Sequence, residues 1–187
     1  IVLAGDLSQD DGLSMVSRAL GDWSGAAPTG FARPDTTLVI PRAVHIVRKV
    51  DAPQSELRVG LVGPSRLTPD YFPLVLCNAI LGGLFSSRLN LNLREEHAYT
   101  YGAHSGIDWR RGAGPFSMET AVQSDVTAAA VREMLAELDR IRCEPVSESE
   151  LSLAHSYLDG VFPIRFETTG SIASALASQA IFGLPAD

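Results

Sequence analysis

The chain has 187 residues, of which 45% are hydrophobic and 20% are charged, and its net charge is −7. Such a composition is typical of a globular chain of one domain, or of one domain with part of another, that buries a core without disulfide support. The negative charge and the lack of a basic run argue against nucleic-acid binding. No apolar run approaches the roughly 20 residues of a membrane span, so we expect none.

The ends of the chain predict a fragment or a processed protein. The sequence starts inside an apolar segment without an initiator methionine, and it stops abruptly at Gly183–Asp187. No targeting segment is recognised, so the cellular compartment stays open.

The first 25 residues predict a strand, 1–5, and a helix that runs to about Leu20. Ser8, three residues before Asp11, suits the start of this helix, because side-chain oxygens satisfy the free N–H groups of a first turn. The chain then holds Gly, Pro, Ser and Thr, which predicts a linker at 26–37. The main domain would be formed by residues 38–187.

Two β-rich segments, 43–50 and 56–62, open the main domain. Thr68 followed by Pro69 predicts the start of a helix that ends near Gly82. The next segment, 85–97, carries leucines at both strand and helix spacing, and Arg94-Glu95-Glu96 favours the helix.

A β-hairpin is the clearest pattern in the sequence. Apolar and polar residues alternate from Tyr99 to Arg110, a Gly-rich turn follows at 111–114, and a second alternating run covers 116–122. Two such runs around a turn predict paired antiparallel strands.

The remainder predicts helices at 127–141, 147–161 and 171–182. Ser147 and Glu150 form a capping box at the start of the second of these helices. Antiparallel strands followed by helices predict an α+β fold with a mostly antiparallel sheet and helices packed on one face.

The sequence offers no metal site. None of its four histidines belongs to an H-x-x-E-H pattern, and the nearest match, Leu93-Arg94-Glu95-Glu96-His97, has a leucine where a ligand is needed. The two cysteines, Cys77 and Cys143, are too few for a disulfide framework, and we expect Cys77 to be buried and Cys143 to be incidental.

Several motifs in fixed order resemble a known family. Leu81-Gly82-Gly83 precedes Ser87-Arg88-Leu89, and Leu93-Arg94-Glu95 precedes Tyr101, which lies seven residues after Arg94. This order resembles the second homologous domain of the pitrilysin/insulinase zinc metallopeptidases, which include mitochondrial processing peptidase. Further segments resemble landmarks of that domain along nearly the whole chain: 1–6, 147–151, 165–167 and 183–185.

Two features depart from the family pattern. Residues 97–100 read His-Ala-Tyr-Thr where the family usually has Arg-Gly-Leu or similar before the tyrosine. The closing strand and helix that follow Gly-Leu-Pro in the family are missing, which supports a truncated chain.

The resemblance implies the non-zinc-binding half of a clamshell peptidase. The first 25 residues would continue the preceding family domain. Zinc and its ligands would lie in a homologous partner half, in the same chain or a separate subunit, and this chain would hold no cofactor and would not be catalytic alone. For an extended peptide substrate, the resemblance implies that Arg94 binds a carbonyl and that Tyr101 faces the developing oxyanion. It makes Gly82 and Gly83 a candidate chamber loop.

Simpler interpretations stay open at the level of sequence. Arg94 could be a surface cation paired with Glu95 or Glu96, and Tyr101 could be a core residue. Gly82 and Gly83 could form a helix C-cap. The whole chain could be a non-catalytic scaffold, as in respiratory-complex core subunits of the same fold, or a peptide-binding subunit.

Overall fold

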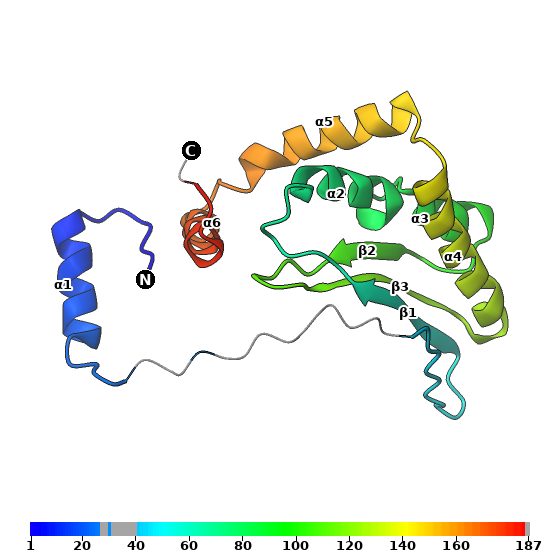
Figure 1. Ribbon diagram of the computed structural model, residues 1–187, viewed down its shortest axis with the longest axis horizontal. Helices are drawn as coiled ribbons and strands as arrows, with labels where there is room; N and C mark the ends of the chain where they lie inside the picture. Colours follow the sequence, from blue (N-terminus) through cyan, green and yellow to red (C-terminus); the bar gives the residue numbers. More distant parts are fainter. Residues whose placement is uncertain (27–29, 31–40, 186–187) are drawn as a thin grey trace. The chain divides into compact units, whose positions relative to one another are not determined.

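The computed structural model describes residues 1–26, 30 and 41–185 (Figure 1). The chain divides into two compact units, one with Ile1–Pro34 and Asp159–Asp187 and the other with Asp35–Leu158. The predicted linker at 26–37 lies almost entirely outside the described residues. The C-terminal residues group with the first unit, whereas the sequence analysis assigned them to the main domain.

The second unit is built on a three-stranded antiparallel sheet. Its order is β1 (Gln54–Val62), β3 (Pro115–Gln123) and β2 (Ala103–Ile107). Helical segments cover one face of the sheet (Figure 1): α2 (Tyr71–Asn78), η1 (Ala79–Gly83), α3 (Arg88–Asn90), η2 (Leu91–Glu96) and α4 (Thr127–Cys143). A single 3-10 turn, η3 (Ser124–Val126), precedes α4. The predicted α+β fold with helices on one face is confirmed.

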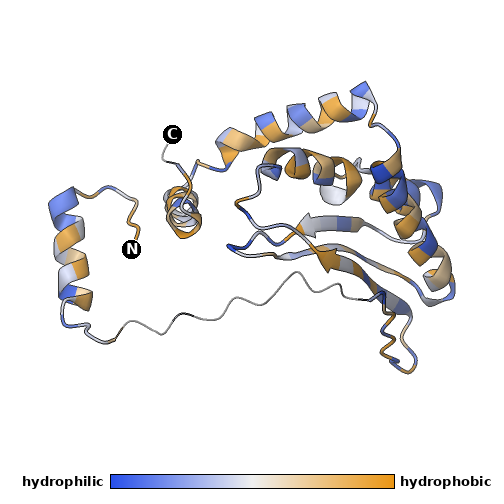
Figure 2. Cartoon of the chain, viewed as in Figure 1, coloured by the Kyte–Doolittle hydropathy of each residue, from blue (hydrophilic) through white to orange (hydrophobic). Residues whose placement is uncertain are grey.

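The core lies between the sheet and these helices. Leu89 and Leu93 from the helical side meet Met118 of β3 and Met134 of α4, and all four are fully buried. Burial of these side chains is the main favourable term for folding, at roughly 1.5–3 kcal/mol each. Both hydrophobic and hydrophilic residues occur along α4, as expected for a helix with one face on a core (Figure 2).

Two predicted strands are not formed. Residues 1–5 and 43–50 have no strand partner in the described part of the chain, and Val44, Ile46 and Val47 are each at least 87% exposed. Their β-branched residues favour an extended backbone, but a strand forms only where a neighbouring backbone supplies its hydrogen bonds. The predicted strand at 56–62 has such a neighbour in β3 and is confirmed.

The predicted helices are formed with small shifts of their ends. Residues 85–97 are helical, and the long predicted helix before them begins at Tyr71 and ends in the π-helical turn η1. The capping box is present, because the Glu150 N–H donates to Ser147 Oγ at 3.2 Å and the Ser147 N–H donates to Glu150 Oε2 at 2.8 Å. The remaining predicted helices correspond to α1 (Gln9–Leu20), α5 (Glu148–Ile164) and α6 (Thr169–Phe182).

One helical stretch in the described residues, Tyr71–Glu96, is long and apolar enough to cross a membrane by these criteria alone. The sequence analysis expected no span. Of its most apolar window 44% is buried within the structure, and a turn at 84–87 interrupts it. Core helices of globular proteins meet the same criteria, and Leu81, Leu89 and Leu93 of this stretch belong to the core.

The outer edge of β2 is closed by two asparagine side chains. The Ala103 N–H donates to Asn90 Oδ1 at 2.9 Å, and Asn90 Nδ2 donates to the Ala103 carbonyl at 2.9 Å. Farther along, Asn78 Nδ2 donates to the Ser105 carbonyl at 3.1 Å. These amides take the place of a neighbouring strand for three backbone groups of the edge, the Ala103 N–H and the carbonyls of Ala103 and Ser105.

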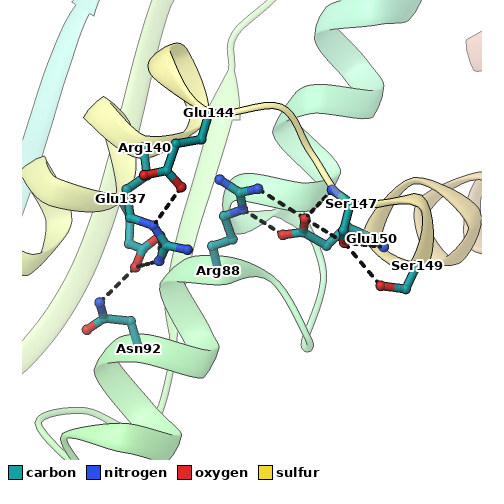
Figure 3. Close-up of polar contacts among 8 residues, drawn as sticks. All are labelled: Arg88, Asn92, Glu137, Arg140, Glu144, Ser147, Ser149 and Glu150. Atoms are coloured by element: carbon teal, nitrogen blue, oxygen red, sulfur yellow. Dashed lines mark hydrogen bonds and ion pairs between the residues drawn. The ribbon is translucent and has the colours of Figure 1, made fainter.

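A buried ion pair joins the helical layer to α5. Arg88 is 8% exposed, and it donates from Nε to Glu150 Oε1 at 2.6 Å and from Nη2 to Glu150 Oε2 at 3.0 Å (Figure 3). This bidentate hydrogen bonding lowers the pKa of Glu150 to about 2, and it also raises the pKa of Arg88. Glu150 therefore caps α5 and holds the start of α3 at the same time.

A second polar contact anchors η2 to α4. Glu137 is buried, accepts from Asn92 Nδ2 at 2.8 Å and pairs with Arg140 Nη1 at 2.9 Å (Figure 3). Each of the two short helical segments that follow Ser87 is thus fixed by a glutamate from a longer helix.

The chain reverses direction at Ala98 between η2 and the β-hairpin. Ala98 has φ 53°, in the left-handed region that favours glycine, and the Tyr99 N–H then donates back to the Leu93 carbonyl at 2.8 Å. A Cβ in this region costs roughly 1–2 kcal/mol.

We predict that Ala98→Gly raises the free energy of unfolding of the chain by about 1 kcal/mol, because it removes the Cβ strain. Urea denaturation followed by circular dichroism measures this change. Ala136→Gly, in the exposed middle of α4, is the control and should lower the same quantity by about 1 kcal/mol. A loss of stability in both variants would contradict the strain assigned to Ala98.

We predict that Glu150→Gln lowers the free energy of unfolding by roughly 3 kcal/mol at pH 7, because it leaves the buried Arg88 charge uncompensated. Since the pKa of Glu150 is lower in the folded chain than in the unfolded one, its contribution is complete above about pH 4.5. It is lost as the pH falls toward 2, so the difference between the two proteins should shrink over that range. Glu148→Gln, in the first turn of α5, is the matched control and should behave like the unaltered chain.

Candidate substrate-binding site

Arg94 lies in η2 with its guanidinium group held on two sides. Its Cζ atom is 3.4 Å from the centre of the Phe85 ring, and its Nη2 donates to the Phe85 carbonyl at 3.4 Å. Its Nε donates to Glu95 Oε1 at 2.8 Å. The side chain is 14% exposed, whereas that of Glu95 is 59% exposed. The pairing with Glu95 is therefore present, between a mostly covered arginine and a carboxylate that is open to water, and such half-exposed pairs contribute little to stability.

Tyr101 stands in the segment between η2 and β2 and is 96% exposed. The alternative that it is a core residue is wrong. The alternating pattern that suggested it starts at Tyr99, but β2 begins only at Ala103, so the residues before it do not follow strand geometry. Tyr99 packs against the core instead, and its ring stacks on His97 at 4.9 Å.

Hydrogen bonds fix the backbone beside Tyr101. The Gly102 N–H donates to Thr100 Oγ1 at 3.1 Å, and the Thr100 hydroxyl donates to the Gly102 carbonyl at 2.9 Å. The Thr120 hydroxyl of β3 lies 2.9 Å from both of these oxygens. The backbone that carries Tyr101 is therefore tied to the sheet while its side chain is free.

No hydrogen bond or ring contact joins Arg94 to Tyr101 within the described residues. Arg94 lies in η2, and Tyr101 lies in the segment between η2 and β2. Each residue is positioned by its own contacts.

Gly82 and Gly83 lie in the last turn of η1 rather than in a loop. A Cβ on Gly82 would lie 2.5 Å from Ser105 Oγ and 2.7 Å from the Ser105 nitrogen, so only glycine lets this turn approach β2. Gly83 is exposed. Neither glycine has a positive φ, so the left-handed C-cap alternative is not formed; the turn that follows begins at Leu84.

The residues that the structure describes do not fit zinc. Leu93, in the position where the sequence pattern lacks a ligand, is fully buried in the core. His97 stacks on Tyr99, and its Nε2 is 3.9 Å from Glu133 Oε2. No cluster of three or more His, Cys, Asp or Glu side chains able to hold a metal occurs in the part of the chain that the structure describes.

The two cysteines are free thiols, Cys77 half-buried and Cys143 exposed. Burial raises the pKa of the Cys77 thiol, and the Arg88 charge offsets this only in part. The Cys77 thiol therefore stays protonated and weakly reactive near neutral pH.

A shallow hollow of about 430 Å³ lies along β2 and β3. Its lining includes His104, Ser117 and Glu119, and neither Arg94 nor Tyr101 contributes to it. Glu119 already accepts from Ser117 Oγ at 3.0 Å, and it lies 3.8 Å from Arg58 of β1. The hollow has no partner-free charge directed into it, so the candidate site stays with Arg94 and Tyr101.

Two residues of the site were missed by the sequence analysis. Phe85 supplies the ring and carbonyl that orient Arg94, and Asn90 joins the Phe85 turn to β2. Both contacts depend on how separate segments pack, and neither residue belongs to a local pattern that predicts them.

Comparisons with known proteins identify the domain. The model of the peptidase M16 inactive domain matches residues 1–158. An uncharacterized zinc protease of Mycobacterium tuberculosis is 27% identical over 136 residues, which cover 73% of this chain and 31% of that protein. The uncharacterized zinc protease YmxG of Bacillus subtilis is 25% identical over 91% of this chain and 41% of its own length. This chain thus spans about a third to two fifths of these relatives.

Solved structures give the same fold. The peptidase M16 inactive domain from Pseudomonas fluorescens matches with a TM-score of 0.68 and 26% identity, over 72% of this chain and 32% of that one. A protease from Helicobacter pylori matches 96% of this chain and 44% of its own with a TM-score of 0.78; its 15% identity supports the fold alone. The resemblance inferred from the sequence is confirmed, and the chain belongs to the M16 peptidases as their inactive domain.

Proposed function

We propose that this chain is the half of an M16 peptidase that closes the peptide chamber and contributes Arg94 and Tyr101 to substrate binding. The observation that carries the proposal is Tyr101, which is 96% exposed on a backbone fixed by several hydrogen bonds. A large aromatic ring in that position adds nothing to the core. An exposed ring on a rigid support is typical of a binding residue.

Arg94 supports the proposal through its arrangement. Stacking on Phe85 fixes the plane of the guanidinium group, and the weak partner Glu95 occupies one of its edges. A substrate carbonyl that replaces Glu95 would accept a charge-assisted hydrogen bond from a donor already in place. Because the arginine side chain is already ordered in the free chain, peptide binding loses less conformational entropy.

Tyr101 would act on the oxyanion that develops at the cleaved bond. A phenol hydroxyl on a fixed backbone donates a hydrogen bond without reorganisation, and such donors contribute on the order of 3 kcal/mol to transition-state stabilisation. Zinc is expected in the partner half, since the residues that the structure describes do not fit it.

The peptide would bind in an extended conformation along a sheet edge. In this chain, the edge of β2 next to Tyr101 is already occupied by Asn90 and Asn78. We therefore assign the pairing edge to the zinc-bearing half, while this chain contacts the peptide through side chains.

We predict that Tyr101→Phe lowers kcat about 100-fold, and Arg94→Ala at least 10-fold, in the complete peptidase formed with the zinc-bearing half. Zinc content and assembly should not change, because neither side chain is part of the core. Peptide cleavage assays with metal analysis and gel filtration measure these effects.

Tyr157→Phe on α5 and Arg111→Ala in the hairpin turn are matched controls for residue type, and both should keep unaltered kinetics. If Tyr101→Phe and Arg94→Ala also leave cleavage unchanged, the site is rejected and a scaffold role is favoured.

A further inference from the structure

We infer that Asn90 is a positioning residue that holds the supports of Arg94 and Tyr101 in one fixed arrangement. The inference rests on the proposed function, and it concerns a residue that contacts neither the substrate nor the two binding side chains. Asn90 ends α3 and is 5% exposed, so its amide acts only within the protein.

The NH2 group of the Asn90 side chain fixes the turn that carries Phe85. Asn90 Nδ2 donates to the Leu84 carbonyl at 3.0 Å and to Ser87 Oγ at 3.1 Å. These contacts bracket Phe85, whose own ring is 76% exposed and has little packing to hold it. Because the ring and carbonyl of Phe85 orient Arg94, the position of the guanidinium group depends on this turn.

The same NH2 group, together with the amide oxygen, fixes the start of β2, two residues after Tyr101. Asn90 exchanges two hydrogen bonds with Ala103, each of 2.9 Å. Together with the threonine contacts at Gly102, they set where the Tyr101 backbone leaves the sheet. One rigid side chain therefore spans both supports.

Comparison with Asn78 distinguishes a positioning role of Asn90 from the simpler role of closing the edge of β2. Asn78 also closes the edge of β2, donating to the Ser105 carbonyl at 3.1 Å and accepting from the Ser105 hydroxyl at 2.8 Å. Among the described residues, its side chain makes no hydrogen bond to the Leu84–Ser87 turn or to Ala103. If edge closure were the whole role of Asn90, the two asparagines would be equivalent.

The first test uses the chain alone and the isosteric substitutions Asn90→Asp and Asn78→Asp, which remove amide donors without leaving a cavity. Amide hydrogen exchange reports local opening. We expect Asn90→Asp to raise exchange at least 10-fold in both 84–87 and 101–103. Asn78→Asp should leave both segments unchanged and raise exchange near Ser105.

If Asn90→Asp does not fold, Ser87→Ala removes one acceptor of the same amide and should raise exchange in 84–87 alone. Unchanged exchange in that segment, or equal effects of the two Asn→Asp variants on it, would overturn the inference.

The second test uses the complete peptidase. Asn90→Asp should lower kcat at least 10-fold with KM changed less than threefold, because a misplaced donor is missed mainly in the transition state. Asn78→Asp should change kcat less than threefold. In the Asn90→Asp background, Arg94→Ala should cost less than it does alone, since the arginine is already misplaced. Additive effects would overturn the inference.

The proposed function and the inference about Asn90 can be rejected independently. Silent Arg94→Ala and Tyr101→Phe variants in the otherwise unaltered peptidase would reject the proposed function. The exchange measurements on the chain alone would still decide whether Asn90 holds the two segments together.

Discussion

The outer edge of β2 runs beneath helices, and every N–H and C=O group on it must be satisfied there without a neighbouring strand. Asn90 and Asn78 satisfy three of these groups with their side-chain amides. Gly82 makes the approach sterically feasible, because it lets η1 come close to Ser105. The helical layer can therefore pack directly on the strand. The two segments that carry the candidate site, the Phe85 turn and the Tyr101 segment, begin at this contact.

Two polar contacts with glutamates also hold this helical layer in place. Arg88 and Asn92 belong to consecutive short segments, and each reaches a glutamate on a longer helix, Glu150 on α5 and Glu137 on α4. Short helices have little stability of their own, so these contacts and the leucine core determine their positions. The surface that presents Arg94 is thus backed by polar contacts of defined geometry as well as by apolar packing, which has less directional preference.

Local patterns predicted the elements whose partners are close in sequence. The alternation at 116–122 predicted β3, and Ser147 with Glu150 predicted the start of α5, because a hairpin and a capping box are both completed within a few residues. The segment 43–50 is also β-rich but forms no strand in the structure, because a strand needs a pairing partner that the local sequence does not specify. Tyr101 was assigned to a strand because the alternation starts at Tyr99, whereas β2 begins only at Ala103.

The family motifs located the candidate residues but not what holds them. Arg94 and Tyr101 were found by their spacing, whereas Phe85 and Asn90 act through contacts between segments and carry no spacing signal of their own. Glu150 is intermediate, since its capping role was predicted and its pairing with Arg88, 62 residues earlier, was not. A motif thus identifies a candidate residue from the local sequence, whereas the orientation of its side chain depends on how several segments pack.

The described part of the chain has no cluster of side chains able to hold a metal, but the segment that fills the core there also carries a candidate binding residue. A fully buried leucine at position 93 commits that part of the helical layer to the core, and the same short segment carries Arg94 on its outer side. Strain at Ala98 and an exposed ring at Tyr101 both cost stability or solubility without adding to the core. Under the proposed function, both features would belong to a rigid surface that faces a bound peptide.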